Sequence, residues 1–168
     1  MSKQKPRPTV ATPHLRVMMD TGAVVAVFDS TDDHHTEAVK FRDSVLKPYR
    51  VKVLTTSFIF QESLTRLKKR ICEGRVPANV LVEARDYMRE RELSVDQRAI
   101  DEAFDILTRY ADQPFSMVDC TTFVLMTREQ ITAAFTFDDH FKIYRYQVGH
   151  ESRGFLKLPE HTSLLQFV

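Results

Sequence analysis

The sequence is poor in cysteine and glycine, and its charges nearly cancel. The two cysteines, Cys72 and Cys120, lie 48 positions apart, a separation that matches no zinc-binding spacing, and two are too few for a disulfide framework. The 24 Lys and Arg residues balance the 23 Asp and Glu residues to a formal charge of +1, so no overall field draws the chain to nucleic acid or a membrane. We therefore expect a protein of the reducing cytoplasm that meets any polyanion through a local basic patch.

Long hydrophobic runs are also missing. The longest apolar run near the start covers 23–28, far short of the roughly 20 residues that span a bilayer. The first sixteen residues contain three prolines and four basic residues but no apolar core, unlike a signal peptide or a membrane anchor. We expect a soluble protein with a flexible tail over 1–14. Because 43% of the 168 residues are hydrophobic, the stretch 15–168 is expected to form one compact domain.

Short apolar runs alternate with amphipathic stretches along the rest of the chain. The apolar runs predict buried strands, and apolar residues at three- and four-residue spacing predict helices between them. We expect strands over 15–19, 51–54, 93–95, 131–137 and 154–158, and helices over 23–28, 34–47, 57–73, 78–92, 97–110 and 116–129. Strands separated by helices favour a mostly parallel sheet with helices on both faces. The predicted fold is a three-layer α/β/α sandwich.

Four acidic residues fall where a parallel sheet places its ligands. Asp20 follows the first predicted strand and Asp138 follows the strand over 131–137. Glu62 lies early in the helix after the second strand, and Asp119 lies in the first turn of a later helix. Ligands of open α/β sheets bind at the carboxyl ends of the strands. We therefore expect these four acids to converge at one edge of the sheet.

Each acid taken alone also has a purely structural explanation. Asp20 could cap the following helix, and Glu62 could pair with Arg66 four residues later. Asp119 completes a capping box with Ser116, and Asp138 could be an ordinary turn residue. Convergence changes this assessment, because carboxylates about 4 Å apart repel by about 4 kcal/mol at an effective dielectric constant near 20 unless a cation lies between them. All-oxygen ligation suits Mg²⁺ or Mn²⁺ completed by phosphate oxygens, which points to phosphodiester hydrolysis.

Four motifs carry a family resemblance. They are Met19-Asp20-Thr21-Gly22-Ala23, then Thr56-Ser57 with Glu62 a turn into the helix, then Ser116-Met117-Val118-Asp119-Cys120-Thr121, and finally Thr136-Phe137-Asp138-Asp139-His140-Phe141. The pattern resembles PIN-domain ribonucleases, and above all the VapC-like toxins of type II toxin-antitoxin pairs. The similarity covers roughly 15–158, and its most specific block is 116–141.

The resemblance implies a Mg²⁺- or Mn²⁺-dependent endoribonuclease that is usually a homodimer and is inhibited by a cognate antitoxin protein. The positions that match the family's acidic quartet are Asp20, Glu62, Asp119 and Asp138. Asp20 and Asp119 are implied as the principal metal ligands, with Glu62 and Asp138 completing the site directly or through water. The polar positions beside these acids are matched by Thr21, Ser116 and Thr136. The metal would form the nucleophile by lowering the pKa of its bound water.

Two features depart from the family pattern. Asp139 occupies a position where relatives often carry a basic residue, so the choice of Asp138 as the fourth acid depends on the register of the Thr-Phe-Asp motif. The stretch 142–153 separates the His-Phe pair from Gly154-Phe155, which relatives usually reach quickly. We expect this insertion to be a loop.

An alternative is a non-catalytic RNA- or protein-binding module with a PIN-like fold. In that interpretation the acids are helix caps, and basic residues of one helix, Arg66, Lys69 and Arg70, bind RNA. The same basic residues would serve a nuclease equally well, so they do not decide between the two. An aspartic protease, suggested by Asp20-Thr21-Gly22, would require a nearly all-β fold and a second copy of the motif. His140 could assist near a phosphate, although a packing or surface role is favoured.

Overall fold

The computed structural model describes residues 15–161; the predicted tail over 1–14 and the segment 162–168 lie outside this range. A five-stranded parallel sheet with the order β3-β2-β1-β4-β7 forms the centre of the molecule. Its strands are β1 (Arg16–Met19), β2 (Lys52–Thr56), β3 (Glu92–Leu93), β4 (Ala133–Phe135) and β7 (Leu156–Leu158). All their carboxyl ends therefore point to one edge of the sheet.

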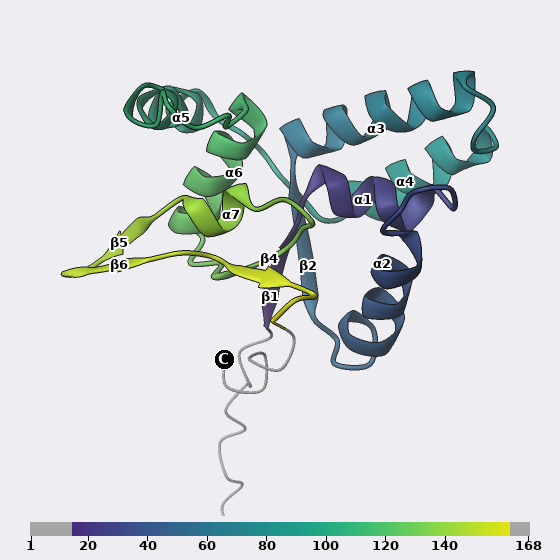
Figure 1. Ribbon diagram of the computed structural model, residues 1–168, viewed down its shortest axis with the longest axis horizontal. Coiled ribbons are helices and arrows are strands. Elements are labelled where there is room, and N and C mark those ends of the chain that lie inside the picture. The colour runs from purple at the N-terminus through teal and green to yellow at the C-terminus, as the bar shows by residue number, and fades with distance from the viewer. Residues whose placement is uncertain (1–14, 162–168) are drawn as a thin grey trace, which may run out of the picture.

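Helices cover both faces of this sheet (Figure 1). One face carries α1 (Thr21–Phe28), α2 (His35–Phe41), α3 (Ser57–Cys72) and α4 (Asn79–Arg89), and α2 continues into a π-helical turn, η1 (Arg42–Leu46). The other face carries α5 (Gln97–Arg109), α6 (Met117–Arg128) and α7 (His140–Ile143). This arrangement confirms the predicted three-layer α/β/α sandwich. No helix among residues 15–161 is long and apolar enough to cross a membrane.

The central strand β1 is buried on both faces. It pairs with β2 and β4, so that Met18 lies opposite Leu54 on one side and Ala134 on the other. Val17, Met18 and Met19 are at most 1% exposed, which explains why this strand is a continuous apolar run without alternation. Because β1 is the middle strand, the residue that follows it lies at the centre of the functional edge.

Side-chain caps fix where α3 and α6, two of the helices that carry site residues, begin. The Thr56 hydroxyl accepts from the backbone N–H of Ile59 at the start of α3. Ser116 caps α6 in a complete capping box with Asp119, as predicted. Asp20 occupies the N-cap position of α1, but its side chain makes no capping hydrogen bond. The structural explanation of Asp20 as a helix cap is therefore wrong.

The insertion over 142–153 is not the loop that the sequence predicts. After the end of α7 it forms an antiparallel hairpin, β5 (Tyr146–Val148) and β6 (Glu151–Arg153). Gly149 in the connecting turn has a φ of +62°, a conformation that glycine adopts without steric cost. The Tyr146 ring stacks on Phe155 with centroids 4.7 Å apart, which anchors the hairpin to the domain. Figure 1 shows it projecting beyond the helices.

Candidate active site

Asp20 lies at the carboxyl end of β1. Its backbone N–H donates to the carbonyl of Phe135 at 3.0 Å, and its Oδ2 accepts from the Thr136 hydroxyl at 3.1 Å. The residue is only 7% exposed. Burial raises the pKa of Asp20 from 3.8 to about 7, and the negative charges of Asp119 and Asp138 add to the increase. Asp20 is thus a carboxyl group placed where its own negative charge is unfavourable.

Asp119 faces Asp20 from the first turn of α6. The capping box fixes this side chain, because its Oδ2 accepts from both the backbone N–H and the hydroxyl of Ser116 at 2.8 Å. The same Oδ2 lies 3.2 Å from Nδ1 of His140. A helix N-terminus carries a partial positive charge that favours a carboxylate. From the sequence alone, this capping box is a purely structural explanation of Asp119. In the structure the same hydrogen bonds hold the Asp119 carboxylate in the site, so the two interpretations are compatible.

Asp138 and His140 reach the same place from the segment after β4. The Thr136 hydroxyl accepts from the backbone N–H of Asp138, and Asp138 Oδ1 accepts from the backbone N–H of His140 at 2.9 Å. His140 Nδ1 lies 3.3 Å from Asp138 Oδ2. One potential ligand atom each from Asp119, Asp138 and His140 falls within 4.8 Å of the others. These three residues form a compact group of potential metal ligands.

Asp139 is directed away from this group. Its Oδ1 lies 2.6 Å from Nζ of Lys157 and 3.4 Å from Nζ of Lys142. These two ammonium groups keep the pKa of Asp139 below its ordinary value. The geometry therefore agrees with the Thr-Phe-Asp register, which selects Asp138 and not Asp139 as the acid of the site.

Glu62 joins the site through hydrogen bonds. Its Oε2 accepts from the Thr21 hydroxyl at 2.7 Å, and its Oε1 accepts from the Arg66 guanidinium at 2.7 Å. The predicted pair with Arg66 is present, and the carboxylate nevertheless stays at the functional edge because Thr21 follows Asp20 directly. Of the predicted polar residues, Thr21 thus orients Glu62, Ser116 orients Asp119, and Thr136 orients Asp20.

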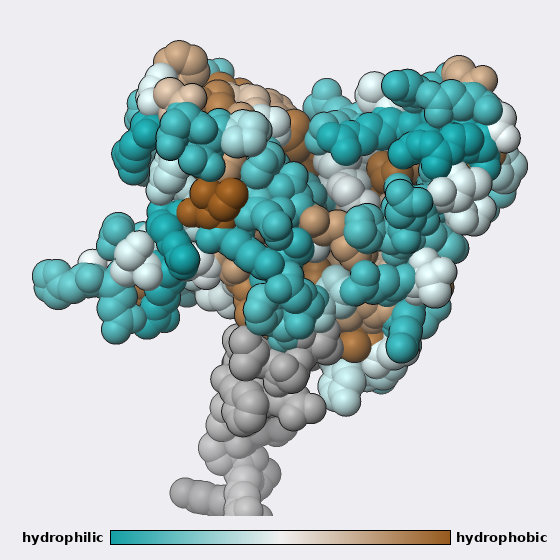
Figure 2. Space-filling model, viewed as in Figure 1, coloured by the Kyte–Doolittle hydropathy of each residue, from teal (hydrophilic) through white to brown (hydrophobic). Residues whose placement is uncertain are grey.

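A cavity of about 680 Å³ opens over these side chains. Figure 2 shows the surface hollowed between the part over α5 and α6 and the largely hydrophilic part over α3. Among the described residues that line the cavity, Arg66 is the only Lys or Arg. Five acids line it: Asp20, Glu62, Asp119, Asp138 and Asp139. The cavity is therefore strongly acidic, with its single guanidinium on the side of α3.

The donor set fits a divalent cation. Three carboxylates, Asp20, Asp119 and Asp138, share one cavity. Burial and the charges of the other two acids raise the pKa of Asp20 by more than its hydrogen bonds to Thr136 and to the backbone of Thr21 lower it. Oxygen ligands suit Mg²⁺ and Mn²⁺, and an imidazole such as that of His140 is acceptable to Mn²⁺. A cation among these groups would remove the repulsion and restore the ionised form of Asp20.

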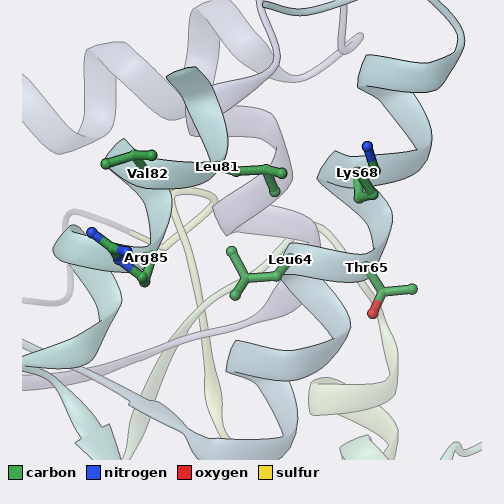
Figure 3. Close-up of a pocket in the computed structure, with 6 residues that line it drawn as sticks. All are labelled: Leu64, Thr65, Lys68, Leu81, Val82 and Arg85. Carbon is green, nitrogen blue, oxygen red and sulfur yellow. The ribbon is translucent and has the colours of Figure 1, made fainter. Parts of the chain in front are cut away.

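The basic stretch of α3 is divided between two grooves. Arg66, Lys69 and Arg70 line a groove of about 380 Å³ beside the acidic cavity. Lys68 lies in a different groove between α3 and α4, with Leu64 and the α4 residues (Figure 3). The three basic residues predicted to bind RNA therefore share a surface next to the candidate site.

His140 is more closely involved in the site than the sequence indicates. It was expected to pack or to face solvent, whereas its ring touches two of the site carboxylates and lies edge-on to Phe115 at 5.2 Å. Its position in the sequence could have indicated this role, because His140 lies only two residues after Asp138 in the segment that follows β4.

Comparison with known protein families identifies the family to which this fold belongs. The family model for the PIN domain matches residues 17–145. The chain belongs to the PIN-domain family. All the residues that line the acidic cavity, from Asp20 to Ile143, lie within the matched region.

Individual relatives of this PIN domain are VapC proteins. The 23S rRNA-specific endonuclease VapC20 of Mycobacterium tuberculosis is 26% identical over 125 residues, which cover 74% of this chain and 91% of the relative. The crystal structure of the same protein, described as a Sarcin-Ricin loop cleaving toxin, superposes with a TM-score of 0.66 at 23% identity and covers 76% of this chain and 93% of the other.

A toxin-antitoxin complex from Klebsiella pneumoniae superposes with a TM-score of 0.51 at 13% identity, covering 73% of this chain and 87% of the other. Together with the family match, these similarities confirm the predicted resemblance to VapC-like PIN domains and the predicted fold class. They also support the nuclease class of function that the resemblance implies.

Proposed function

We propose that this protein is a metal-dependent endoribonuclease that hydrolyses phosphodiester bonds of RNA. The observation that carries the proposal is the buried Asp20, which faces Asp119 and Asp138 and has its pKa raised to about 7. A fold does not retain such a costly arrangement for stability. It is useful where a divalent cation and a phosphate complete the site.

Mg²⁺ or Mn²⁺ would be held by Asp20 and Asp119, with Asp138 and Glu62 completing the site directly or through water. When bound, such a cation lowers the pKa of a coordinated water and stabilises charge on the phosphate. The chain's own contribution is orientation: Thr136 fixes Asp20, Ser116 fixes Asp119 and Thr21 fixes Glu62.

Two further side chains contact the reacting region in this proposal. The Arg66 guanidinium, which lines the cavity and is 55% exposed, donates hydrogen bonds to a phosphate oxygen. The Nδ1 of His140, between Asp119 and Asp138, keeps both carboxylates in register. The alternative of a non-catalytic binding module requires the acids to be only caps, and Asp20 makes no capping bond.

The relatives indicate the substrate and the partners to examine. VapC20 is a 23S rRNA-specific endonuclease, so we propose ribosomal RNA as the first substrate class to test. A similar fold in a toxin-antitoxin complex supports a role as the toxin of such a pair, with a cognate antitoxin as inhibitor. We further propose a homodimer that acts on RNA in the cytoplasm.

The test is cleavage of purified ribosomal RNA by the protein freed of any co-purified partner. Cleavage should require Mg²⁺ or Mn²⁺, stop in EDTA, and be lost in Asp119→Asn and Asp138→Asn. Asp139→Asn is the matched control, since Asp139 is paired with Lys157; this variant should cleave like the wild type. Undiminished cleavage by Asp119→Asn or in EDTA would refute the proposal.

A further inference from the structure

A second groove adjoins the acidic cavity and has a different chemistry. It has a volume of about 380 Å³ and shares Gly22, Arg66 and Phe137 with the cavity. Beyond these shared residues it is lined by Val25, Asp32, His34, Lys69, Arg70 and Glu73. Its two acids lie beside basic residues of α3. An RNA strand that passes through the acidic cavity can therefore continue into this groove along a surface that starts at Arg66.

The His34 ring forms the outer layer of a stack of aromatic side chains. It lies parallel to the Phe137 ring, with centroids 4.2 Å apart and planes at 8°. Phe137 in turn contacts the fully buried Phe135 edge-on at 5.9 Å. His34 itself is exposed. The stack therefore presents an aromatic plane to solvent, supported from behind by the core.

Ion pairs to α3 hold the segment that carries His34. The backbone N–H of His34 donates to Asp32, and the Arg70 guanidinium lies 3.9 Å from Asp32 and 3.5 Å from the buried Asp29. Arg75 also pairs with Asp29. Arg70, predicted from the sequence to contact RNA, therefore acts here as a positioning residue for the His34 segment.

Lys69, unlike Arg70, is highly exposed and only weakly paired. Its side chain is 81% exposed, and its nearest carboxylate, on Glu73, is 3.9 Å away. A surface pair at that distance contributes little to stability, so the ammonium group is available to a phosphate. Arg66 and Lys69 are three positions apart on α3 and lie on one face of the helix. They provide two phosphate contacts along one side of the groove.

We propose that this groove is a nucleotide subsite in which a base next to the cleaved bond stacks on His34 over Phe137, while Arg66 and Lys69 contact the flanking phosphates. Sequence-tolerant binding of single-stranded RNA combines these two elements, aromatic platforms for bases and cations along the backbone. The inference rests on the proposed function and adds to it the residues that bind the strand outside the acidic cavity. His34 and Lys69 are binding residues in this arrangement.

The test compares four variants by fluorescence anisotropy with a short fluorescein-labelled single-stranded RNA of mixed sequence, in EDTA so that the RNA stays intact. His34→Ala should bind about tenfold more weakly, and His34→Phe should restore the affinity because it keeps the aromatic plane. Lys69→Ala should bind more weakly and lower the slope of log affinity against log salt by about 0.7. His34→Ala should leave that slope unchanged. Lys68→Ala is the control on the same helix, since Lys68 lines the other groove (Figure 3).

The same variants are then compared for cleavage with Mn²⁺, where His34→Ala and Lys69→Ala should raise KM more than they lower kcat. Affinities and KM values of both variants equal to those of Lys68→Ala, with a wild type that cleaves, would overturn the subsite and leave the proposed function intact. A wild type that neither binds nor cleaves RNA would overturn the proposed function and the subsite with it.

Discussion

The two ends of α1 carry two buried aspartates with opposite surroundings. Asp29 follows the helix and is 0% exposed, and the guanidinium groups of Arg70 and Arg75 lie 3.5 and 3.6 Å from its Oδ2. Asp20 precedes the helix and is 7% exposed. Among residues 15–161 no Lys or Arg forms an ion pair with Asp20, and its charged neighbours are Asp119 and Asp138.

The helix itself makes the contrast clearer. Its dipole favours a negative charge at the N-terminus, where Asp20 lies, and disfavours one at the C-terminus, where Asp29 lies. Asp29 is compensated by two arginines, so it ties the segment before α2 to α3. Asp20 has no such countercharge among the described residues, which is the situation that an external cation would relieve. A buried carboxyl group therefore indicates a functional role here only where no described Lys or Arg balances its charge.

The largest expected difference between the two aspartates concerns activity. Asp20→Asn should lower RNA cleavage by about a hundredfold or more, because it removes a proposed metal ligand and its negative charge. Asp29→Asn should retain most of the activity. Initial rates with the same RNA and Mn²⁺ concentration measure both. Equal losses in the two variants, with both folded by circular dichroism, would contradict the division into a functional and a structural end.

For stability we expect the opposite: substitution of Asp29 should lower the free energy of unfolding more than substitution of Asp20. Asp29→Ala should lower the free energy of unfolding by about 3 kcal/mol, because it removes a buried carboxylate that pairs with Arg70 and Arg75 and accepts two hydrogen bonds from Thr31. The control is Asp33→Ala, an exposed residue of the same segment, which should change stability by less than about 0.5 kcal/mol. Urea unfolding of the metal-free protein measures the difference. A change as small as that of the control would show that Asp29 is not a structural anchor.

The free energy of unfolding should depend on pH because Asp20, unlike a carboxyl group with an ordinary pKa, titrates near neutrality. The pKa of Asp20 in the folded protein, about 7, lies above its ordinary value of 3.8, so the folded state holds this proton more tightly than the unfolded state. The stabilisation is fully present below the ordinary pKa and is lost as pH rises through 7. From about pH 5 to about pH 8 the metal-free protein should lose about 3 kcal/mol through this group.

Asp20→Asn is the variant that isolates this contribution, because it cannot ionise. The difference in unfolding free energy between Asp20→Asn and the wild type should grow in favour of the variant as pH increases. Urea titrations at the two pH values, both in EDTA, measure it. A constant difference across the range would show that Asp20 does not titrate near neutrality.

The smallest expected effect concerns the cap that orients Asp119. Ser116→Ala should lower the free energy of unfolding by about 1 kcal/mol, because it removes the hydroxyl that caps α6. Ser116→Thr keeps a hydroxyl and should recover most of the loss. Thermal unfolding of the two variants is the measurement. If Ser116→Ala were neutral in stability, the capping box would contribute nothing to holding the acid in place.

Much of the fold can be predicted from the apolar pattern. The apolar residues of β1 (Val17–Met19) and of β4 are consecutive because both faces of these strands are buried, and a parallel sheet brings the residues after its strands to one edge. The convergence of Asp20 and Asp138 could be predicted for that reason, and the position of Asp119 in the first turn of a helix predicted that it joins them. The choice between Asp138 and Asp139 could be proposed from the motif and agrees with the contacts of Lys157.

Other features depend on contacts between distant segments. The hairpin of β5 and β6 has few apolar residues and is anchored by Tyr146 against Phe155, so its short strands carry no clear pattern. The ion pairs of Asp29 with Arg70 and Arg75 join residues more than forty positions apart. The stacking of His34 on Phe137 joins residues from opposite parts of the chain. No local periodicity encodes such pairs.

The most direct test of a metal site at Asp20 is calorimetric titration of the metal-free protein with Mn²⁺. We predict binding by the wild type and by Asp29→Asn, and loss of that binding in Asp20→Asn and Asp119→Asn. Within residues 15–161, Asp29 is paired with Arg70 and Arg75, whereas neither Asp20 nor Asp119 forms an ion pair with a Lys or Arg. Binding of Mn²⁺ by Asp119→Asn with wild-type affinity, or no binding by the wild type, would contradict this assignment.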